Sequence, residues 1–165
     1  MSLESCPYIE LSNWLYGMPV DPTLFDSEIR QINNDGLVLE FGVATGTSIE
    51  RIRKLTKRKV YGFDSFEGLP EDWNPKDPKG SFKCDPPEVS DGIYLIRGLF
   101  QDTLDDFLKQ HGGSVALCHI DSDLYSSAAF VLSRLKDRFV SGSLLIFDEI
   151  FGHEAVMHEA RAFYE

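Results

Sequence analysis

Residues 36–48 read GLVLEFGVATGTS, an apolar run followed by a glycine-containing turn and a helix-like stretch. The run is apolar through its middle, which suits a parallel strand covered on both faces. Glycines in the turn allow a tight bend and let a ligand approach the backbone. The exposed N–H groups at a helix start favour an anionic group such as phosphate or carboxylate. This stretch therefore predicts a strand, a ligand-binding turn and a helix, in that order.

The same alternation of strand and helix repeats along the chain. Near-continuous apolar runs predict five strands, at residues 36–43, 59–64, 93–97, 114–121 and 143–148. Apolar residues at helical spacing predict helices between them, at residues 48–57, 103–110 and 126–138. Such an order predicts an α/β sandwich with a mostly parallel sheet. Right-handed crossovers place the carboxyl ends of all strands on one edge, where ligands bind.

One connection breaks this rhythm. Residues 70–92 contain five of the eight prolines of the chain, with Trp73 and Phe82 between them. A structureless connection of this length inside a compact domain is typical of a functional loop or of disorder. We interpret it as a lid or substrate wall, and a surface loop without a role is the alternative.

Composition excludes several classes of function. The 165 residues include 16 Lys and Arg against 27 Asp and Glu, a formal net charge of −11, which argues against nucleic-acid binding. The longest apolar runs fall far short of the ~20 residues needed to cross a bilayer, so we expect no membrane association. Residues 1–10 lack the basic and apolar regions of a signal peptide, so we expect a cytoplasmic protein.

A carboxylate ends the second predicted strand. Asp64 lies in GFDSFEG at residues 62–68, about twenty residues past the glycine turn, where an acid accepts hydrogen bonds from a ribose diol. Phe66 is interpreted as packing near the nucleoside, with core packing as the alternative. The glycine spacing is GxxxG, from Gly42 to Gly46, and not the GxGxxG of dinucleotide sites. The pair of signals predicts a nucleoside-containing ligand other than NAD.

Four acids follow two other strands. Asp121 and Asp123 end the fourth predicted strand, and Asp148 and Glu149 end the fifth. If these strands are neighbours, repulsion among the carboxylates would raise their pKa values unless a cation intervenes. Oxygen ligands of this kind suit Mg²⁺. Capping of the following helices is the alternative explanation of Asp121 and Asp148.

Four strings of residues resemble a known family. They are LEFG at 39–42 with Gly46 and Ser48, GFDSFEGLP at 62–70, HIDSDLYSS at 119–127 and FDE at 147–149. Over residues 36–165 the sequence resembles class I S-adenosylmethionine-dependent methyltransferases, and among them the macrocin O-methyltransferase (TylF-like) family. The resemblance implies a Rossmann-like three-layer sandwich of seven strands, of which five are readable here.

The resemblance also implies roles for individual residues. It places Glu40, Gly42 and Gly46 around the methionine moiety, Asp64 on the ribose and residues 98–102 near the adenine. The full expected cofactor-binding set is Glu40, Gly42, Gly46, Ser48, Asp64, Ser65, Phe66, Gln101 and Asp102. It further implies a divalent metal, expected to be Mg²⁺, on Asp121, Asp148 and Glu149, with Asp123 as the base and Asp121 as a second catalytic residue.

We therefore expect an S-adenosylmethionine-dependent O-methyltransferase, assisted by a divalent metal, that acts on a hydroxyl of a small molecule such as a sugar or a secondary metabolite. A non-catalytic S-adenosylmethionine-binding module and an NAD-dependent reductase are the alternatives. Residues 1–35 are expected to form an N-terminal helical or lid segment, and residues 36–165 the methyltransferase domain. The resembled fold has two strands after the fifth, which we expect to be missing from this sequence. The acceptor is the expected partner, and a homo-oligomer is left open.

Overall fold

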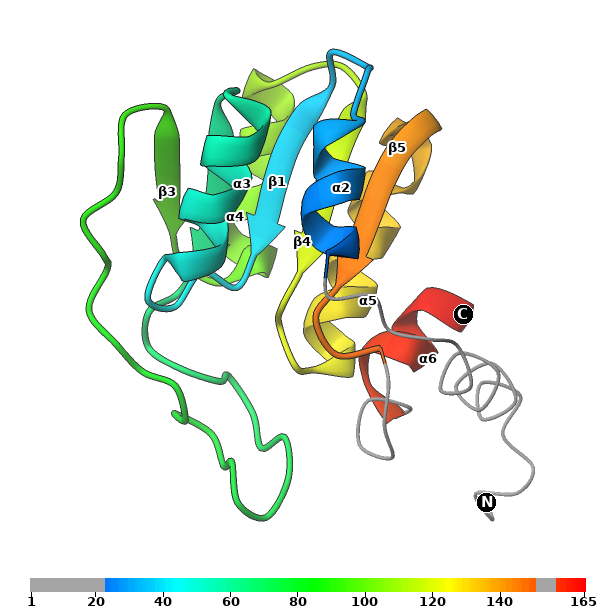
Figure 1. Ribbon diagram of the computed structural model, residues 1–165. Helices are drawn as coiled ribbons and strands as arrows, with labels where there is room; N and C mark the ends of the chain where they lie inside the picture. Colours follow the sequence, from blue (N-terminus) through cyan, green and yellow to red (C-terminus); the bar gives the residue numbers. More distant parts are fainter. Residues whose placement is uncertain (1–22, 151–156) are drawn as a thin grey trace.

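The computed structural model describes residues 23–150 and 157–165 of the chain. Its strands form one five-stranded sheet in the order β3-β2-β1-β4-β5 (Figure 1), and every neighbouring pair is parallel. The strands are β1 (Leu37–Phe41), β2 (Val60–Asp64), β3 (Ile93–Arg97), β4 (Val115–Ile120) and β5 (Phe139–Phe147). The parallel sheet predicted from the apolar runs is confirmed.

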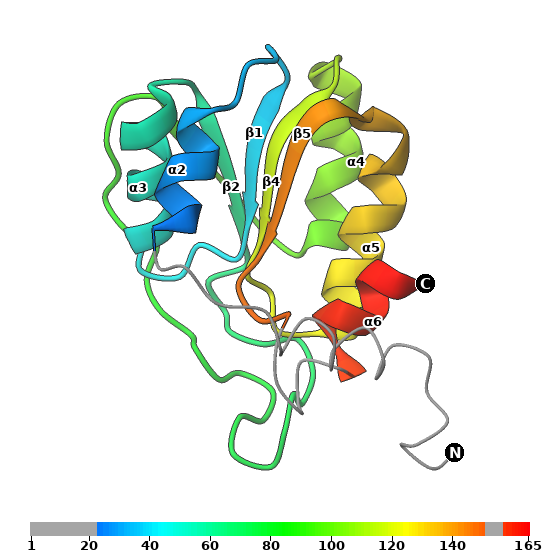
Figure 2. The ribbon, with the colours of Figure 1, turned by 45° about the vertical axis from the view of Figure 1, so that its right-hand side comes forward.

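Helices cover both faces of this sheet. Figure 2 shows α2 (Leu24–Arg30) and α3 (Thr47–Thr56) on one face, and α4 (Phe100–Gln110) and α5 (Tyr125–Leu135) on the other. The short 3₁₀ helix η2 (Lys136–Arg138) follows α5, and α6 (Glu159–Tyr164) packs near α5. The molecule is thus the expected three-layer α/β sandwich, with a Rossmann-like arrangement of its strands.

Two apolar clusters hold the layers together, one on each face of the sheet. Leu39, Phe41 and Phe63 belong to the cluster that packs under α4 and α5. Val38 of β1 belongs to the second cluster, together with Ile49 and Ile52 of α3, on the face that α2 and α3 cover. All six residues of β4 are buried, as expected for a central parallel strand covered on both sides.

The starts of two elements differ most from the sequence-based expectation. β5 begins at Phe139 and not at residue 143, because its backbone pairs with β4 at Val115 although the intervening Ser141 and Gly142 are polar or small. α4 begins at Phe100 and not at residue 103, so Gln101 and Asp102 lie in a helix and not in a turn. Of the expected N-terminal segment, residues 1–22 lie outside the described residues, as do residues 151–156 of the expected methyltransferase domain.

The order in which the strands are added to the sheet reverses between β1 and β4, and the backbones that follow these two strands meet there. The Asp121 amide donates to the Phe41 carbonyl at 2.8 Å. Gly42 has a φ of 94°, and a Cβ placed on it would lie 1.7 Å from the carbonyl oxygen of Asp121. Glycine is therefore required at position 42, both for its conformation and for this close approach.

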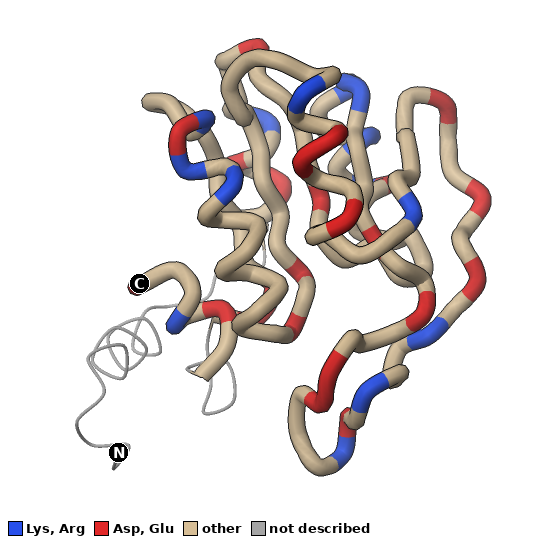
Figure 3. Tube along the Cα trace, turned by 180° about the vertical axis from the view of Figure 1, so that it is seen from behind, with Lys and Arg blue, Asp and Glu red and all other residues tan. Residues whose placement is uncertain are grey.

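Charged residues of both signs mark the loop that joins β2 and β3 (Figure 3). Within residues 23–150 and 157–165, no helix has the length and apolar character needed to span a membrane.

Candidate functional site

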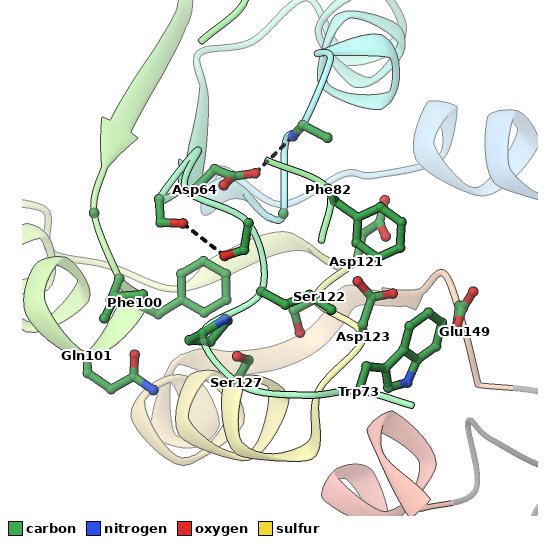
Figure 4. Close-up of a pocket in the computed structure, with 18 residues that line it drawn as sticks. Asp64, Trp73, Phe82, Phe100, Gln101, Asp121, Ser122, Asp123, Ser127 and Glu149 are labelled. Carbon is green, nitrogen blue, oxygen red and sulfur yellow. Dashed lines mark hydrogen bonds between the residues drawn. The ribbon is translucent and has the colours of Figure 1, made fainter. Parts of the chain in front are cut away.

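A cavity of about 340 Å³ opens at the carboxyl edge of the sheet (Figure 4). Residues that follow all five strands line it, and the loop between β2 and β3 adds Trp73 and Phe82. Asp64 lies on one side, and Asp121, Asp123 and Glu149 lie on the other. The described lining residues include four carboxylates and neither Lys nor Arg. The topology thus brings two predicted groups of acids to one small volume.

Asp64 organises the glycine turn. Its Oδ2 accepts the amides of Val43 and Ala44 at 2.8 and 2.9 Å, and its Oδ1 accepts the Phe66 amide at 2.7 Å. A carboxylate has about four acceptor sites, so capacity for a further donor remains beside these three bonds. Asp64 therefore shapes the turns after β1 and β2 as well as lining the cavity.

Only part of the expected cofactor-binding set lines the cavity. Gly42, Asp64, Ser65 and Gln101 do. The others lie elsewhere: Phe66 is buried in the core under α3, Gly46 caps α3 beside Pro87, Ser48 lies in α3, Asp102 lines a second cavity beside α4, and Glu40 is buried in β1.

Glu40 forms a buried pair with the neighbouring strand. His119 lies opposite it in the β1–β4 register, and His119 Nδ1 donates to Glu40 Oε1 at 2.8 Å. The two side chains are 0% and 2% exposed. Burial opposes a charged imidazole, but the hydrogen bond and charge of Glu40 outweigh it and raise the pKa of His119. His119 packs in the core as the partner of this carboxylate.

The acids that follow β4 carry raised pKa values. Burial raises the pKa of Asp123 to about 7, and the charges of Glu149 and Asp121 add to the effect. Burial likewise raises the pKa of Asp121 to about 6, with Asp148 as the next contribution. An acid with a pKa near neutrality is suited to proton transfer, and uncompensated negative charge of this kind attracts a cation.

Three side chains at this position are arranged so that they can share a metal ion. One donor atom from each of His119, Asp121 and Asp148 lies within 4.8 Å of the others. Asp121 and Asp148 belong to the metal set expected from the sequence. Glu149, its third expected member, lines the cavity but does not belong to this group, and His119 takes its place.

Stability of the metal-free protein is expected to fall as the pH rises. The pKa values of Asp121, Asp123 and Glu159 in the folded state, about 6, about 7 and about 7, lie above those of an unfolded chain. Their stabilising contribution is therefore complete below the unfolded-state values and is lost as the pH passes through the folded-state values. Calorimetry in excess chelator should give a melting temperature several degrees higher at about pH 5 than at about pH 8. A melting temperature that is equal or higher at the alkaline pH would contradict the raised pKa values.

The loop between β2 and β3 forms one wall of the cavity without regular structure of its own. Trp73 and Phe82 meet edge to face, with ring centroids 6.4 Å apart. Ser126 of α5 donates to Glu71 at 2.5 Å near one end of the loop, and Ser90 donates to Glu50 of α3 near the other. The loop therefore rests on helices from both faces of the sheet.

Two polar hydrogens in the cavity lack a partner among the described residues. They belong to the Ser122 hydroxyl, whose oxygen is buried, and to the Trp73 indole Nε1. Buried donors of this kind are costly unless a ligand or water accepts from them. Each is therefore an unsatisfied polar group in a residue that lines the cavity.

Sequence reasoning missed two parts of this site. Ser122 lies in the HIDSDLYSS string, whose pattern assigns it no role. Glu159 was not predicted as a site residue, although its side chain is 1% exposed and contacts both acid-bearing loops. Nothing in its local sequence, EARAFY, marks a glutamate aimed at the sheet, because the contact is made only through tertiary packing.

Comparisons with known proteins identify the family and the fold. A family model described as "Methyltransferase domain" matches residues 39–150. No curated protein matches the sequence.

Solved structures share the fold. The crystal structure of CalS11, described as a calicheamicin methyltransferase, is 21% identical with a TM-score of 0.70, over 94% of this chain and 81% of its own. An apo structure of CalS11, described as a TDP-rhamnose 3'-O-methyltransferase, is 20% identical with a TM-score of 0.61, over 99% and 88%. The O-methyltransferase NovP is 23% identical with a TM-score of 0.56, over 76% of this chain and 64% of its own.

Proposed function

The chain belongs to the methyltransferase-domain family, and from this premise we propose that it transfers the methyl group of S-adenosylmethionine to a hydroxyl oxygen of a small molecule, with the help of a divalent cation. The observation that carries the proposal is the single cavity that joins Asp64, at the end of β2, to the acids after β4 and β5. In such folds a nucleoside is held at the position of Asp64, and a hydroxyl would be activated at the acids after β4 and β5.

Residues on the β1 and β2 side have the chemistry needed for S-adenosylmethionine. The backbone at Gly42 leaves no room for a side chain, Asp64 retains acceptor capacity for a ribose hydroxyl, and Gln101 offers an amide at the cavity wall. The carboxylates surround the cavity with negative charge, which suits a cationic sulfonium. We assign Gly42, Asp64, Ser65 and Gln101 to direct contact with the donor. Glu40, Gly46, Ser48, Phe66 and Asp102 are assigned to support of these loops.

Asp123 is the base of the proposed reaction. The acceptor hydroxyl gives its proton to the carboxylate of Asp123, while its oxygen bonds to the methyl carbon and the carbon–sulfur bond of the sulfonium breaks. The products are the methyl ether and S-adenosylhomocysteine. A base with a pKa of about 7 is matched to this task near neutral pH. Alignment of oxygen and methyl group in one cavity can supply about 7–11 kcal/mol of the barrier reduction.

The acidic cluster has a suitable donor set for a divalent cation. Asp121 and Asp148 would hold it, with either His119 or Glu149 as a further ligand. When bound, the cation would stabilise negative charge on the acceptor oxygen and lower the pKa of its hydroxyl. Carboxylate ligands favour Mg²⁺ or Mn²⁺, whereas an imidazole ligand would shift the preference toward later transition metals.

A sugar or a secondary-metabolite scaffold is the proposed acceptor, in line with the resemblance to macrocin O-methyltransferases. The solved structures that share the fold are described as enzymes that act on molecules of this kind. Four acids at the cavity weigh against a non-catalytic binding module, and the GxxxG turn weighs against a reductase that uses NAD. We propose that residues 36–165 form the methyltransferase domain and that residues 1–35 are an N-terminal segment, of which α2 packs against one face of the sheet.

Replacing Asp64 with asparagine is expected to weaken S-adenosylmethionine binding at least tenfold. The substitution removes a charged acceptor, and hydrogen bonds to charged groups are worth about 1.5–3 kcal/mol each. Titration calorimetry measures the affinity. Asp105→Asn is the matched control, since Asp105 pairs with Arg134 on the surface of α4 and α5 and should leave the affinity unchanged. Equal affinity of the Asp64 variant and the wild type would overturn the donor site.

A further inference from the structure

Two backbone N–H groups, one after β4 and one after β5, cannot pair with each other directly. The direct ladder between these strands ends where the Asp148 amide donates to the Ile120 carbonyl at 2.9 Å. One step further along each strand end, the Ser122 and Glu149 amides both face the same carboxylate. Two N–H groups cannot bond to each other, so only an acceptor placed between them can continue the connection.

Glu159, the first residue of α6, supplies this acceptor. Its Oε1 accepts the Ser122 amide at 3.1 Å, and its Oε2 accepts the Glu149 amide at 3.3 Å. The side chain is 1% exposed. Burying a carboxylate is costly unless its oxygens are bonded, and here both oxygens are used for the two strand ends.

The amides that Glu159 binds belong to the segments that carry the acids. Ser122 lies between Asp121 and Asp123, and Glu149 follows Asp148. The preceding residue, His158, accepts the Tyr125 amide at 3.2 Å, which is an otherwise unpaired donor at the start of α5. Glu159 and His158 thus connect the beginning of α6 to the loop after β4, to the start of α5 and to the segment after β5.

We propose that Glu159 is a positioning residue, whose carboxylate sets the separation between the Asp121–Asp123 segment and the Asp148–Glu149 segment. The inference rests on the proposed function. Glu159 acts through the backbone and touches neither the methyl donor nor the acceptor. Without the Glu159 carboxylate the two segments separate, and the site that they form loses affinity for a divalent cation. The donor site at β1 and β2 keeps its shape.

Glu159→Gln tests this assignment, because it keeps the size of the side chain and replaces one acceptor oxygen by an NH₂ group that faces an N–H. Glu165→Gln is the matched control: it makes the same change at the C-cap of the same helix, where Glu165 accepts from Tyr125 and Arg161 at the surface. Three quantities are measured at about pH 8: the exchange rates of the Ser122 and Glu149 amides by NMR in chelator, the Mn²⁺ affinity, and the S-adenosylmethionine affinity.

In Glu159→Gln we expect both amides to exchange at least ten times faster and Mn²⁺ affinity to fall about 10–100-fold, the usual effect of losing an outer-shell contact. Donor affinity should stay within about twofold, and Glu165→Gln should match the wild type in all three. Unchanged amide exchange, or a loss of donor and Mn²⁺ affinity in equal measure, overturns the proposal. Glu159→Asp supplies the same comparison should the glutamine variant not fold. Failure of the wild type to bind Mn²⁺ would count against the metal in the proposed function, and the amide exchange would still decide the role of Glu159.

Discussion

Replacing Asp123 with asparagine is expected to lower kcat by about 10²–10⁴-fold, the usual contribution of a general base. Asp123 has a φ of 60°, in the left-handed region that asparagine tolerates better than most residues, so the backbone is expected to stay in place. Donor and cation affinities should therefore stay close to those of the wild type. Steady-state kinetics and calorimetry on the same preparations separate these effects.

The pH profile gives this prediction a second readout. In the wild type kcat should rise as Asp123 deprotonates, with an apparent pKa near the value of about 7 for the metal-free protein, or lower once a cation is bound. The asparagine variant should lack this rise. Asp106→Asn, which alters only an exposed pair with Lys109, serves as the control. A kcat within threefold of the wild type, about 0.7 kcal/mol, would exclude Asp123 as the base.

Removal of divalent cations is expected to abolish methyl transfer and to leave S-adenosylmethionine binding nearly unchanged. The reason is spatial: the donor site draws on the ends of β1 and β2, whereas the cation would bind beyond β4 and β5. Activity should be assayed after exhaustive chelation and again after Mg²⁺ or Mn²⁺ is restored, with donor affinity measured in both states.

Asp148→Asn should reproduce the effect of chelation, because it removes one of the two carboxylates assigned to the cation. It should also leave the donor affinity intact, which distinguishes it from Asp64→Asn. Full activity in excess chelator would exclude the metal. Asp121 and Asp148 would then have to be explained as helix caps, with Asp123 as a lone base.

Much of the fold was predictable from the sequence because buried parallel strands carry a strong local signal. β3 has the predicted bounds, and β1, β2 and β4 lie within the predicted runs. The start of β5 was not predictable, because Phe139 pairs with Val115 ahead of an irregularity in the ladder that contains the exposed Ser141 and Gly142. The start of α4 was missed because Phe100 and Gln101 follow directly on a glycine turn.

The candidate site was predictable to the level of strand ends but not of contacts. Asp64, Asp121 and Asp123 could be brought together by topology alone, because parallel strands present their carboxyl ends on one edge. The pairing of Glu40 with His119 depends on which strand neighbours β1 and in which register. The contact of Glu159 depends on how α6 packs. Neither is encoded in a local pattern.

The close approach of Gly42 to Asp121 divides the cavity wall into a part that cannot vary and a part that can. A side chain at position 42 would collide with the peptide group that carries the first acid, so redesign of this enzyme has to leave that contact intact. Trp73 and Phe82 instead reach the cavity from a loop outside the sheet. Changing them alters the shape presented to an acceptor without moving the strand ends, which makes these two aromatic positions the natural starting point for a library aimed at new acceptors.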